Sequence, residues 1–172
     1  NEIQQAIQNI GAICDITKEA NQKLYEFNLA LTETQLKNRS PKVLMLYSYE
    51  GDDHLSQLPQ RAAGKSFHQD ILETVGGRNA YQGDLNAPIM SQEGILLLNP
   101  DIIILLQGDQ NKELEQSRSI TVEKIYPNWR SLQDLSAIKN DQIYMMKGEP
   151  TFIASPDAVI ATLKSLHTVL SQ

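Results

Sequence analysis

The stretch Asp-Ile-Ile-Ile-Leu-Leu at residues 101–106 is too apolar for a strand that exposes one face to water. Residues 42–48, Lys-Val-Leu-Met-Leu-Tyr-Ser, form a second buried run, and residues 142–146 are expected to form a further strand. Strands that are apolar on both faces are typical of parallel sheets covered by helices on both sides. We therefore expect an α/β fold, a Rossmann-like lobe with a central, mainly parallel sheet flanked by helices.

Helical patterns alternate with these strands. Apolar residues recur at helical spacing over residues 2–13, from Thr17 toward Asn38, and over 67–75 and 155–170. The second pattern contains neither glycine nor proline, so we expect a stiff rod about 30 Å long before the sequence Ser40-Pro41. Shorter helices are expected at residues 91–98 and 128–135, and Gly76 can supply a left-handed cap after residue 75.

Length, charge and cysteine content limit what this protein can be. The chain has 172 residues, enough for one ordinary domain, and a net charge of -6 without a basic stripe, which disfavours nucleic-acid binding. Cys14 is the single cysteine, so no internal disulfide can form, and we expect it to pack as a small core residue. The start of the chain lacks a charged region followed by an apolar one, so we expect a processed product or a piece of a longer protein.

Ligands of open α/β sheets bind outside the carboxyl ends of the strands. Here those ends fall at residues 47–49, 107–109 and 147–152, and the long connections 49–66 and 107–128 begin at two of them. Tyr47 and Tyr49 alternate around Ser48, so one ring is expected to face the core and the other the ligand site. Arg61 follows in a segment of small residues, either as a solvated cation or as an anion contact.

Other chemistry has weaker support. The sequence contains no nucleophile elbow and no phosphate-binding loop, and Gly76-Gly77 follows a helix rather than a strand. The three histidines, His54, His68 and His167, are scattered, and we expect solvated side chains rather than metal ligands. Trp129 is expected to pack rather than to bind a ligand.

Several stretches, in this order, resemble the C-terminal half of the ABC-importer solute-binding proteins that deliver iron–siderophores, haem and cobalamin. The matching stretches are residues 63–67 (AGKSF), 70–72 (DIL), 76–80 (GGRNA), 90–93 (MSQE), 98–104 (LNPDIII), 129–132 (WRSL), 137–144 (AIKNDQIY) and the closing helix. The resemblance covers residues 41–170, and residues 1–40 are similar to the last helix of the family's N-terminal lobe followed by its long interlobe helix.

The resemblance implies two α/β lobes joined by one rigid helix, with the ligand between them. This chain would supply that helix region, residues 1–40, and the C-terminal lobe, residues 41–172. Ligand contacts of the family correspond here to Gln60, Arg61, Ala87, Glu149, Phe152 and Ile153, to which the strand ends add Tyr47 and Tyr49. An acidic residue that docks onto the permease in this family corresponds to Glu93.

The resemblance further implies a non-enzymatic, periplasmic or extracytoplasmic receptor, with or without a membrane anchor in its precursor. It would capture an iron complex, a siderophore or haem, and deliver it to an ABC permease in the inner membrane, with no cofactor or catalytic residue and no nucleic-acid partner. Three alternatives stay open: cobalamin as ligand, although Ala87 stands where relatives can have an aromatic residue; a small α/β enzyme using Glu149; and a metal-ion receptor using His54 or His68.

Overall fold

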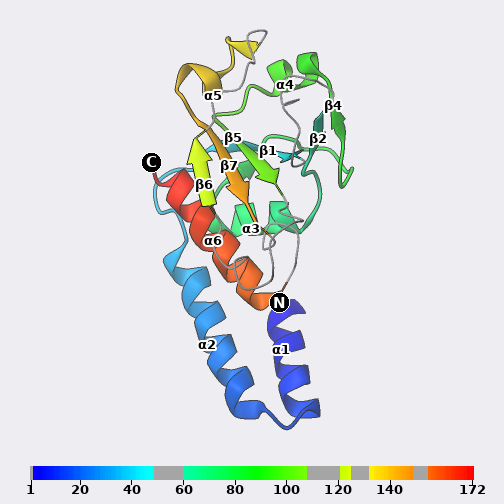
Figure 1. Cartoon of the computed structure of the whole chain (residues 1–172), viewed down its shortest axis with the longest axis vertical. Coiled ribbons are helices and arrows are strands. Elements are labelled where there is room, and N and C mark those ends of the chain that lie inside the picture. The colour runs from blue at the N-terminus through cyan, green and yellow to red at the C-terminus, as the bar shows by residue number, and fades with distance from the viewer. Residues whose placement is uncertain (1, 49–59, 108–120, 125–131, 149–154) are drawn as a thin grey trace.

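A computed structural model gives the arrangement of residues 2–48, 60–107, 121–124, 132–148 and 155–172, and every structural statement below concerns these residues (Figure 1). Within them, no helix combines the length and the apolar character that crossing a lipid bilayer requires.

Three parallel strands form the centre of the fold: β1 (Lys42–Ser48), β5 (Ile102–Gln107) and β7 (Ile143–Lys147). β5 pairs with β1 along one edge and with β7 along the other. Its residues from Ile102 to Leu106 are all buried, as expected for a strand with both faces covered. The structure thus confirms an α/β lobe with a mainly parallel sheet.

Shorter strands extend this centre on both sides. The order of the sheet is β4-β2-β1-β5-β7-β6, and β3 pairs with the start of β1. The outer strands are β2 (Gln60–Ala62), β3 (Arg78–Asn79), β4 (Ile89–Met90) and β6 (Thr121–Lys124). β2 and β6 lie in connections for which the sequence predicted only loops, so that prediction was wrong for these residues. Strands of three or four mixed residues are too short to show a period of two.

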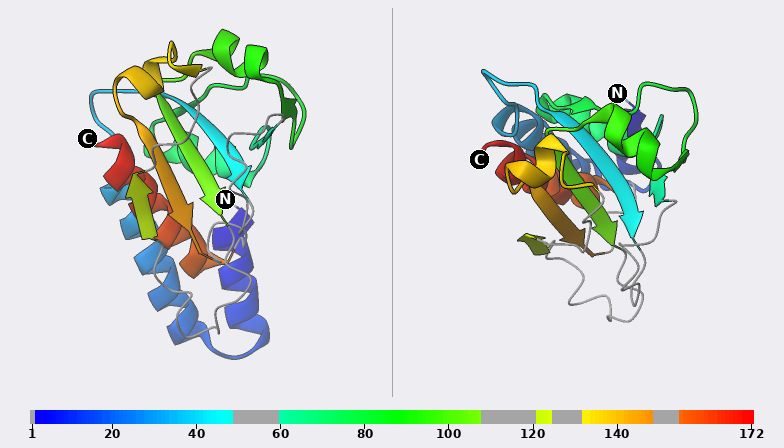
Figure 2. Two further views of the ribbon diagram at one scale, coloured as in Figure 1. Left: turned by 45° about the horizontal axis from the view of Figure 1, so that its top comes forward. Right: turned by 90° about the horizontal axis from the view of Figure 1, so that it is seen from above.

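Helices cover both faces of the sheet (Figure 2). On one face α2 (Thr17–Glu33), α3 (Phe67–Val75) and α6 (Pro156–Leu170) share a core with alternate residues of the central strands. On the other face lie α4 (Gln92–Leu98) and α5 (Ser136–Lys139). Gly76 ends α3 with φ 102°, and the Ser155 side chain caps the first turn of α6.

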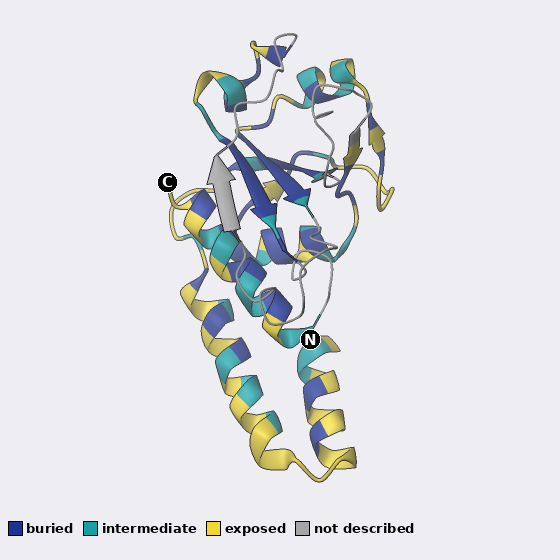
Figure 3. Cartoon of the chain, viewed as in Figure 1, coloured by how far each residue is buried: buried dark blue, intermediate teal, exposed yellow. Residues whose placement is uncertain are grey.

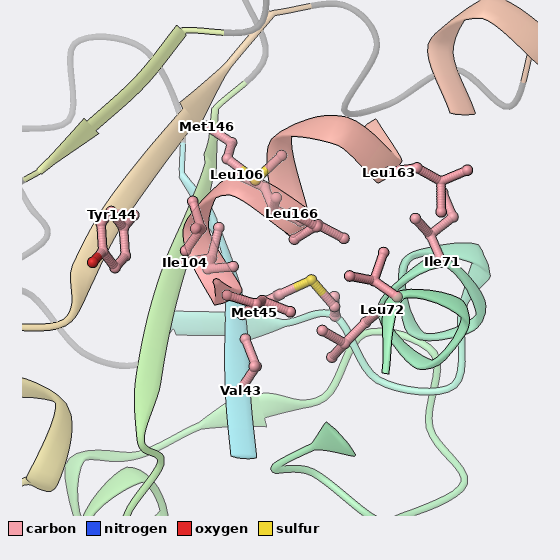
Figure 4. Close-up of a cluster of buried hydrophobic side chains, with 14 of the residues drawn as sticks. Val43, Met45, Ile71, Leu72, Ile104, Leu106, Tyr144, Met146, Leu163 and Leu166 are labelled. Carbon is pink, nitrogen blue, oxygen red and sulfur yellow. The ribbon is translucent and has the colours of Figure 1, made fainter. Parts of the chain in front are cut away.

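The larger core joins strands β1, β5 and β7 to helices α3 and α6 (Figure 4). Met45, Ile104 and Leu106 project from the sheet toward Leu72 and Leu166, and all five side chains are at most 1% exposed. Each side chain of this size contributes roughly 1.5–3 kcal/mol when it leaves water. Burial of these side chains is therefore a main source of the stability of the lobe.

α1 (Glu2–Ile13) and α2 pack against each other and extend beyond the sheet as a helical hairpin (Figures 1 and 3). α2 ends at Glu33, earlier than the sequence pattern indicated; Thr34 follows as the C-cap, and both its backbone amide and its hydroxyl donate to the Ala30 carbonyl. α2 packs against the rest of the lobe through Phe27, whose side chain is 1% exposed and belongs to the larger core. Apolar side chains along the hairpin stay exposed: Ile10, Ile13, Ile16, Tyr25 and Leu29.

A further expectation was wrong, and another is only partly covered by the described residues. Cys14 is exposed in the turn between α1 and α2, because the helical stripe of α1 ends one turn earlier. Of the helix expected at residues 128–135, only residues 132–135 are described; there Leu132 belongs to a 3₁₀ turn and the following residues form a turn before α5, so this expectation stays a prediction.

Phe27 provides a test of how the hairpin is held. We expect Phe27→Ala to lower the free energy of unfolding by about 3–5 kcal/mol, because it leaves a cavity where α2 enters the larger core. Tyr25→Ala is the matched control on the same helix, since Tyr25 is 63% exposed, and we expect a change within about 0.5 kcal/mol. Urea denaturation of both variants measures the difference, and equal losses would contradict this account of α2.

Candidate ligand-binding site

The central strands end in polar residues at one edge of the sheet. The last pair of β1 and β5 joins Ser48 to Gln107, and the last pair of β5 and β7 joins Gln107 to Lys147. These carboxyl ends are where parallel α/β sheets bind ligands. Four residues expected at the site follow in the chain and lie outside the described residues: Tyr49, Glu149, Phe152 and Ile153.

Arg61 lies beside the end of β1. It pairs across the sheet with Tyr47 on one side and with Ile89 of β4 on the other. Antiparallel partners place their side chains on the same face of a sheet. The Arg61 side chain is exposed, and no carboxylate of the described residues pairs with it. A cation in this position is free to contact an anionic ligand.

The pairing of β2 with β4 continues beyond the strands themselves. The amides of Ala62, Gly64 and Lys65 donate to the carbonyls of Pro88, Asn86 and Leu85 at 2.9, 2.9 and 3.0 Å. Residues 60–65 and 85–90 therefore run antiparallel at the margin of the sheet, paired as strands at 60–61 and 89–90 and joined by these backbone hydrogen bonds beyond them; we call this pair of segments the edge ladder. It brings Gln60, Arg61 and Ala87, three residues expected at the site, onto one structure; Ala87 is exposed, and Gln60 pairs with Met90.

The edge ladder depends on Gly64. A Cβ atom at this position would collide with the Leu85 carbonyl oxygen and meet the Pro88 ring at 2.8 Å. The neighbouring backbone is held by Asn79, whose buried amide group donates to the Ala63 carbonyl at 2.9 Å. Gly64 and Asn79 both belong to stretches that carry the family resemblance. In the structure Gly64 allows the two segments to approach closely, and Asn79 holds the backbone beside it.

His68 is buried, and the expectation of a solvated histidine was wrong for it. The side chain is 3% exposed, its Nδ1 lies 3.2 Å from the Tyr47 hydroxyl, and its ring contacts the Phe67 ring at a centroid distance of 3.9 Å. The contact fixes the Tyr47 ring at the end of β1. The signal was present in the sequence, since residues 68, 71, 72 and 75 have the spacing of a buried helical stripe.

The other histidines do not join this group. His167 is half-buried, and its Nδ1 lies 2.9 Å from the Thr34 carbonyl oxygen, where it connects α6 to the end of α2. His54 lies outside the described residues, as does Trp129. In the part of the chain that the structure describes, no three His, Cys, Asp or Glu residues are grouped as metal ligands.

Glu93 lies in the first turn of α4, at the end of the lobe away from the helical hairpin (Figure 1). Its side chain is exposed, and the Ser91 hydroxyl accepts a hydrogen bond from the Gly94 amide at 3.1 Å. Hydrogen bonds from its own backbone amide and from the Ser91 side chain lower the pKa of the Glu93 carboxyl. Glu93 therefore keeps its charge further into the acid range than a free glutamate, at a place where a partner can reach it.

No family model and no curated protein matches the sequence. Solved structures do match its fold. The structure of Staphylococcus aureus IsdE complexed with heme is 20% identical in sequence and matches with a TM-score of 0.71, over 99% of this chain and 64% of the IsdE chain. The siderophore-binding protein BauB, bound to two acinetobactin molecules and ferric iron, matches at 18% identity and a TM-score of 0.73, over 97% of this chain and 57% of its own.

This chain has the fold of one lobe of such binding proteins. A possible iron-binding (periplasmic solute-binding) protein from Staphylococcus epidermidis matches in the same way, at 20% identity and a TM-score of 0.69, over 99% of this chain. This chain spans between 57% and 64% of the length of these three proteins. The likeness fixes the fold, while the ligand and partners of this chain are matters for proposal.

Gly64 gives a direct test of the edge ladder. We expect Gly64→Ala to destabilise the lobe by roughly 1–3 kcal/mol, because the methyl group forces the two segments of the ladder apart. Hydrogen exchange at the amides of residues 64 and 65 should accelerate more than exchange in β5. Gly94→Ala in α4 is the control: its neighbours are the ends of flexible side chains, and we expect a neutral change or a gain of up to about 1 kcal/mol. A harmless Gly64→Ala would contradict the close approach of the two segments.

Proposed function

We propose that this protein is the substrate-binding component of an ABC importer, which captures an iron complex, a ferric siderophore or haem, and delivers it to a membrane permease. The observation that carries the proposal is the match of nearly the whole chain, 99% and 97%, to proteins solved with haem or a ferric siderophore. The position of Arg61 beside the polar ends of the central strands supports it.

In this proposal the ligand is held between two lobes and released unchanged, so the protein is not an enzyme. Residues 41–172 form the lobe described here, and residues 1–40 connect it to a second lobe. α2 spans Thr17–Glu33 without glycine or proline, so the connection resists bending and closure of the lobes is small. Binding then depends on the fit of two rigid surfaces around the ligand.

Recognition of the ligand uses the edge at which the strands end. Arg61 provides the positive charge, Tyr47 a ring fixed by His68, and Gln60 and Ala87 the neighbouring positions of the edge ladder. Tyr49, Glu149, Phe152 and Ile153 follow the same strand ends in the chain, and we assign them to the ligand as well. An anionic iron complex is the ligand class that suits this set of groups.

Delivery uses a different surface. Glu93 is exposed and charged, and no cation of the described residues forms an ion pair with it. We assign it to docking on arginines of the permease. Charged groups at the rim of such a contact set its register and its rate of association. A receptor with this role works in the periplasm or an equivalent extracytoplasmic space.

Arg61→Ala tests the ligand contact. We expect haemin, an anionic probe, to bind about tenfold more weakly to the two-lobed protein, because one charge-assisted hydrogen bond is lost. Arg78→Ala is the matched control, since Arg78 is exposed and donates to the Ser40 carbonyl near the opposite end of β1. Isothermal titration calorimetry compares the two variants. Unchanged affinity in Arg61→Ala removes Arg61 from the site.

Glu93→Arg tests the docking surface. We expect the affinity for haemin in solution to stay within about twofold, while uptake of the iron complex into cells falls at least tenfold, because reversed charge repels the permease. Glu73→Arg, on the exposed side of α3, serves as the control and should leave both measurements unchanged. A loss of solution binding equal to the loss of uptake would contradict a role limited to docking.

A further inference from the structure

Four cations gather where β1 begins. Lys37, Arg39 and Lys42 come from the segment that leads from α2 into β1, and Arg78 comes from β3. Lys37, Arg39 and Arg78 are exposed, and Lys42 is half-buried. We call these four residues the basic margin. Nothing in the candidate ligand site uses them.

Backbone contacts hold Arg78 beside the segment that precedes β1. Arg78 is the sheet partner of Lys42, and its amide donates to the Pro41 carbonyl at 2.9 Å. Its Nε donates to the Ser40 carbonyl at 3.1 Å, next to Arg39 in the chain. Paired residues of neighbouring strands project to the same face of a sheet, so the fold brings together cations that are far apart in the sequence.

The segment that carries Lys37 is also fixed to the body of the lobe. The Leu36 amide donates to the Val75 carbonyl at 2.8 Å, and a Cβ atom at Gly76 would meet the Leu36 side chain at 3.3 Å. Residues 36–42 therefore run along residues 75–78. The connection from α2 to β1 lies at the side of the lobe where the chain ends (Figure 1).

The charges of the basic margin are not neutralised by ion pairs. Residues 34–42 and 74–83 contain no aspartate or glutamate, and among the described residues no carboxylate forms an ion pair with any of the four cations. Asp101 adjoins the margin, but its Oδ2 accepts from the Lys42 backbone amide at 2.8 Å. Four cations and this one carboxylate leave three net positive charges, in a chain whose net charge is -6.

The character of the basic margin points to the kind of partner. None of the exposed large apolar side chains of the described residues belongs to residues 34–42 or 74–80. Stable contacts between proteins rely on buried apolar or aromatic anchors. A layer of lipid headgroups needs none, because each cation that comes close to an anionic membrane contributes separately to binding.

We propose that the basic margin binds the protein to a membrane surface that carries anionic lipid headgroups. Lipid phosphates accept hydrogen bonds from arginine and lysine side chains. The acidic remainder of the chain is repelled by the same surface, so the contact is weak, reversible and oriented. This inference goes beyond the proposed function: it concerns how the receptor stays at the membrane, not which ligand it carries. Six steps along β1, about 20 Å, separate Lys42 from Ser48 at the candidate site.

The experiment measures how much of the protein sediments with lipid vesicles. At about 0.05 M NaCl, we expect at least tenfold stronger partitioning onto vesicles of equal parts phosphatidylglycerol and phosphatidylcholine than onto phosphatidylcholine alone. Raising NaCl to about 0.5 M should remove the difference, because the screening length falls to about 4 Å.

Two double variants locate the contact. Lys37→Glu/Arg39→Glu should lower partitioning onto the anionic vesicles at least tenfold, and it keeps the side-chain hydrogen bond of Arg78. Lys18→Glu/Lys164→Glu is the matched control: both lysines are exposed, on α2 and α6, and the net charge changes by the same amount. We expect the control to lose less than threefold. Unaltered melting temperatures would show that both variants remain folded.

Equal losses in the two variants would show that net charge rather than the basic margin governs binding, and would overturn the inference. Equal partitioning onto both kinds of vesicle would do the same. Polyglutamate that binds more tightly than the anionic vesicles would assign the margin to an acidic protein. Inorganic phosphate that displaces the protein from vesicles at constant ionic strength would assign it to a discrete phosphate site. Either result overturns the membrane contact.

Haemin titration of the same proteins keeps this inference separate from the proposed function. We expect Lys37→Glu/Arg39→Glu to bind haemin as the parent protein does. Haemin binding without vesicle binding would overturn the membrane contact and leave the receptor. Vesicle binding without binding of any iron complex would overturn the receptor and leave the membrane contact.

Discussion

Strand β5 imposes the constraint on which the rest of the structure depends. It is paired along both edges and covered on both faces, so every residue from Ile102 to Leu106 is removed from water. Buried backbone groups must find hydrogen-bonding partners, which fixes β1 and β7 in register beside it. Because parallel strands end at the same edge, this register also places Gln107 between Ser48 and Lys147 and so determines where a ligand can sit.

The outer edge of β1 explains why the site forms at one end of the sheet. Lys42 and Val43 pair with the parallel strand β3, whereas Leu46 and Tyr47 pair with the antiparallel strand β2. The change of partner lets β2 continue as the edge ladder at the carboxyl end of β1. Gly64 allows the two segments of that ladder to approach closely, and Asn79 of β3 donates to Ala63 in the ladder. One edge of β1 thereby contributes both to the core and to the candidate site.

The sequence predicted the elements that carry long apolar patterns and failed where elements are short. The central strands, α3 and α6 were identified within a residue or two, because each buries a complete stripe or both faces. β2, β4 and α5 contain two to four residues and leave no periodicity. Arg61 and Ala87 were assigned to the candidate site through a family resemblance. Their position on one ladder depends on hydrogen bonds between segments that are distant in the sequence, and such bonds cannot be predicted from local sequence patterns. The burial of His68 was missed because its polar side chain interrupts the apolar pattern of a helical stripe.

Burial and exposure to solvent make different demands on the few residues at this margin of the sheet. On the edge ladder the three consecutive residues 62–64 are buried, while Arg61 and Lys65, which flank them, are exposed. Along the facing segment Pro88 and Met90 are buried. Leu85, Ala87 and Ile89 are exposed. Changing these exposed residues removes no core contact, so the residues beside the candidate site can vary widely while the fold is retained. This separation is consistent with the comparisons, in which this chain shares its fold both with a protein solved with haem, at 20% identity, and with a protein solved with a ferric siderophore, at 18% identity.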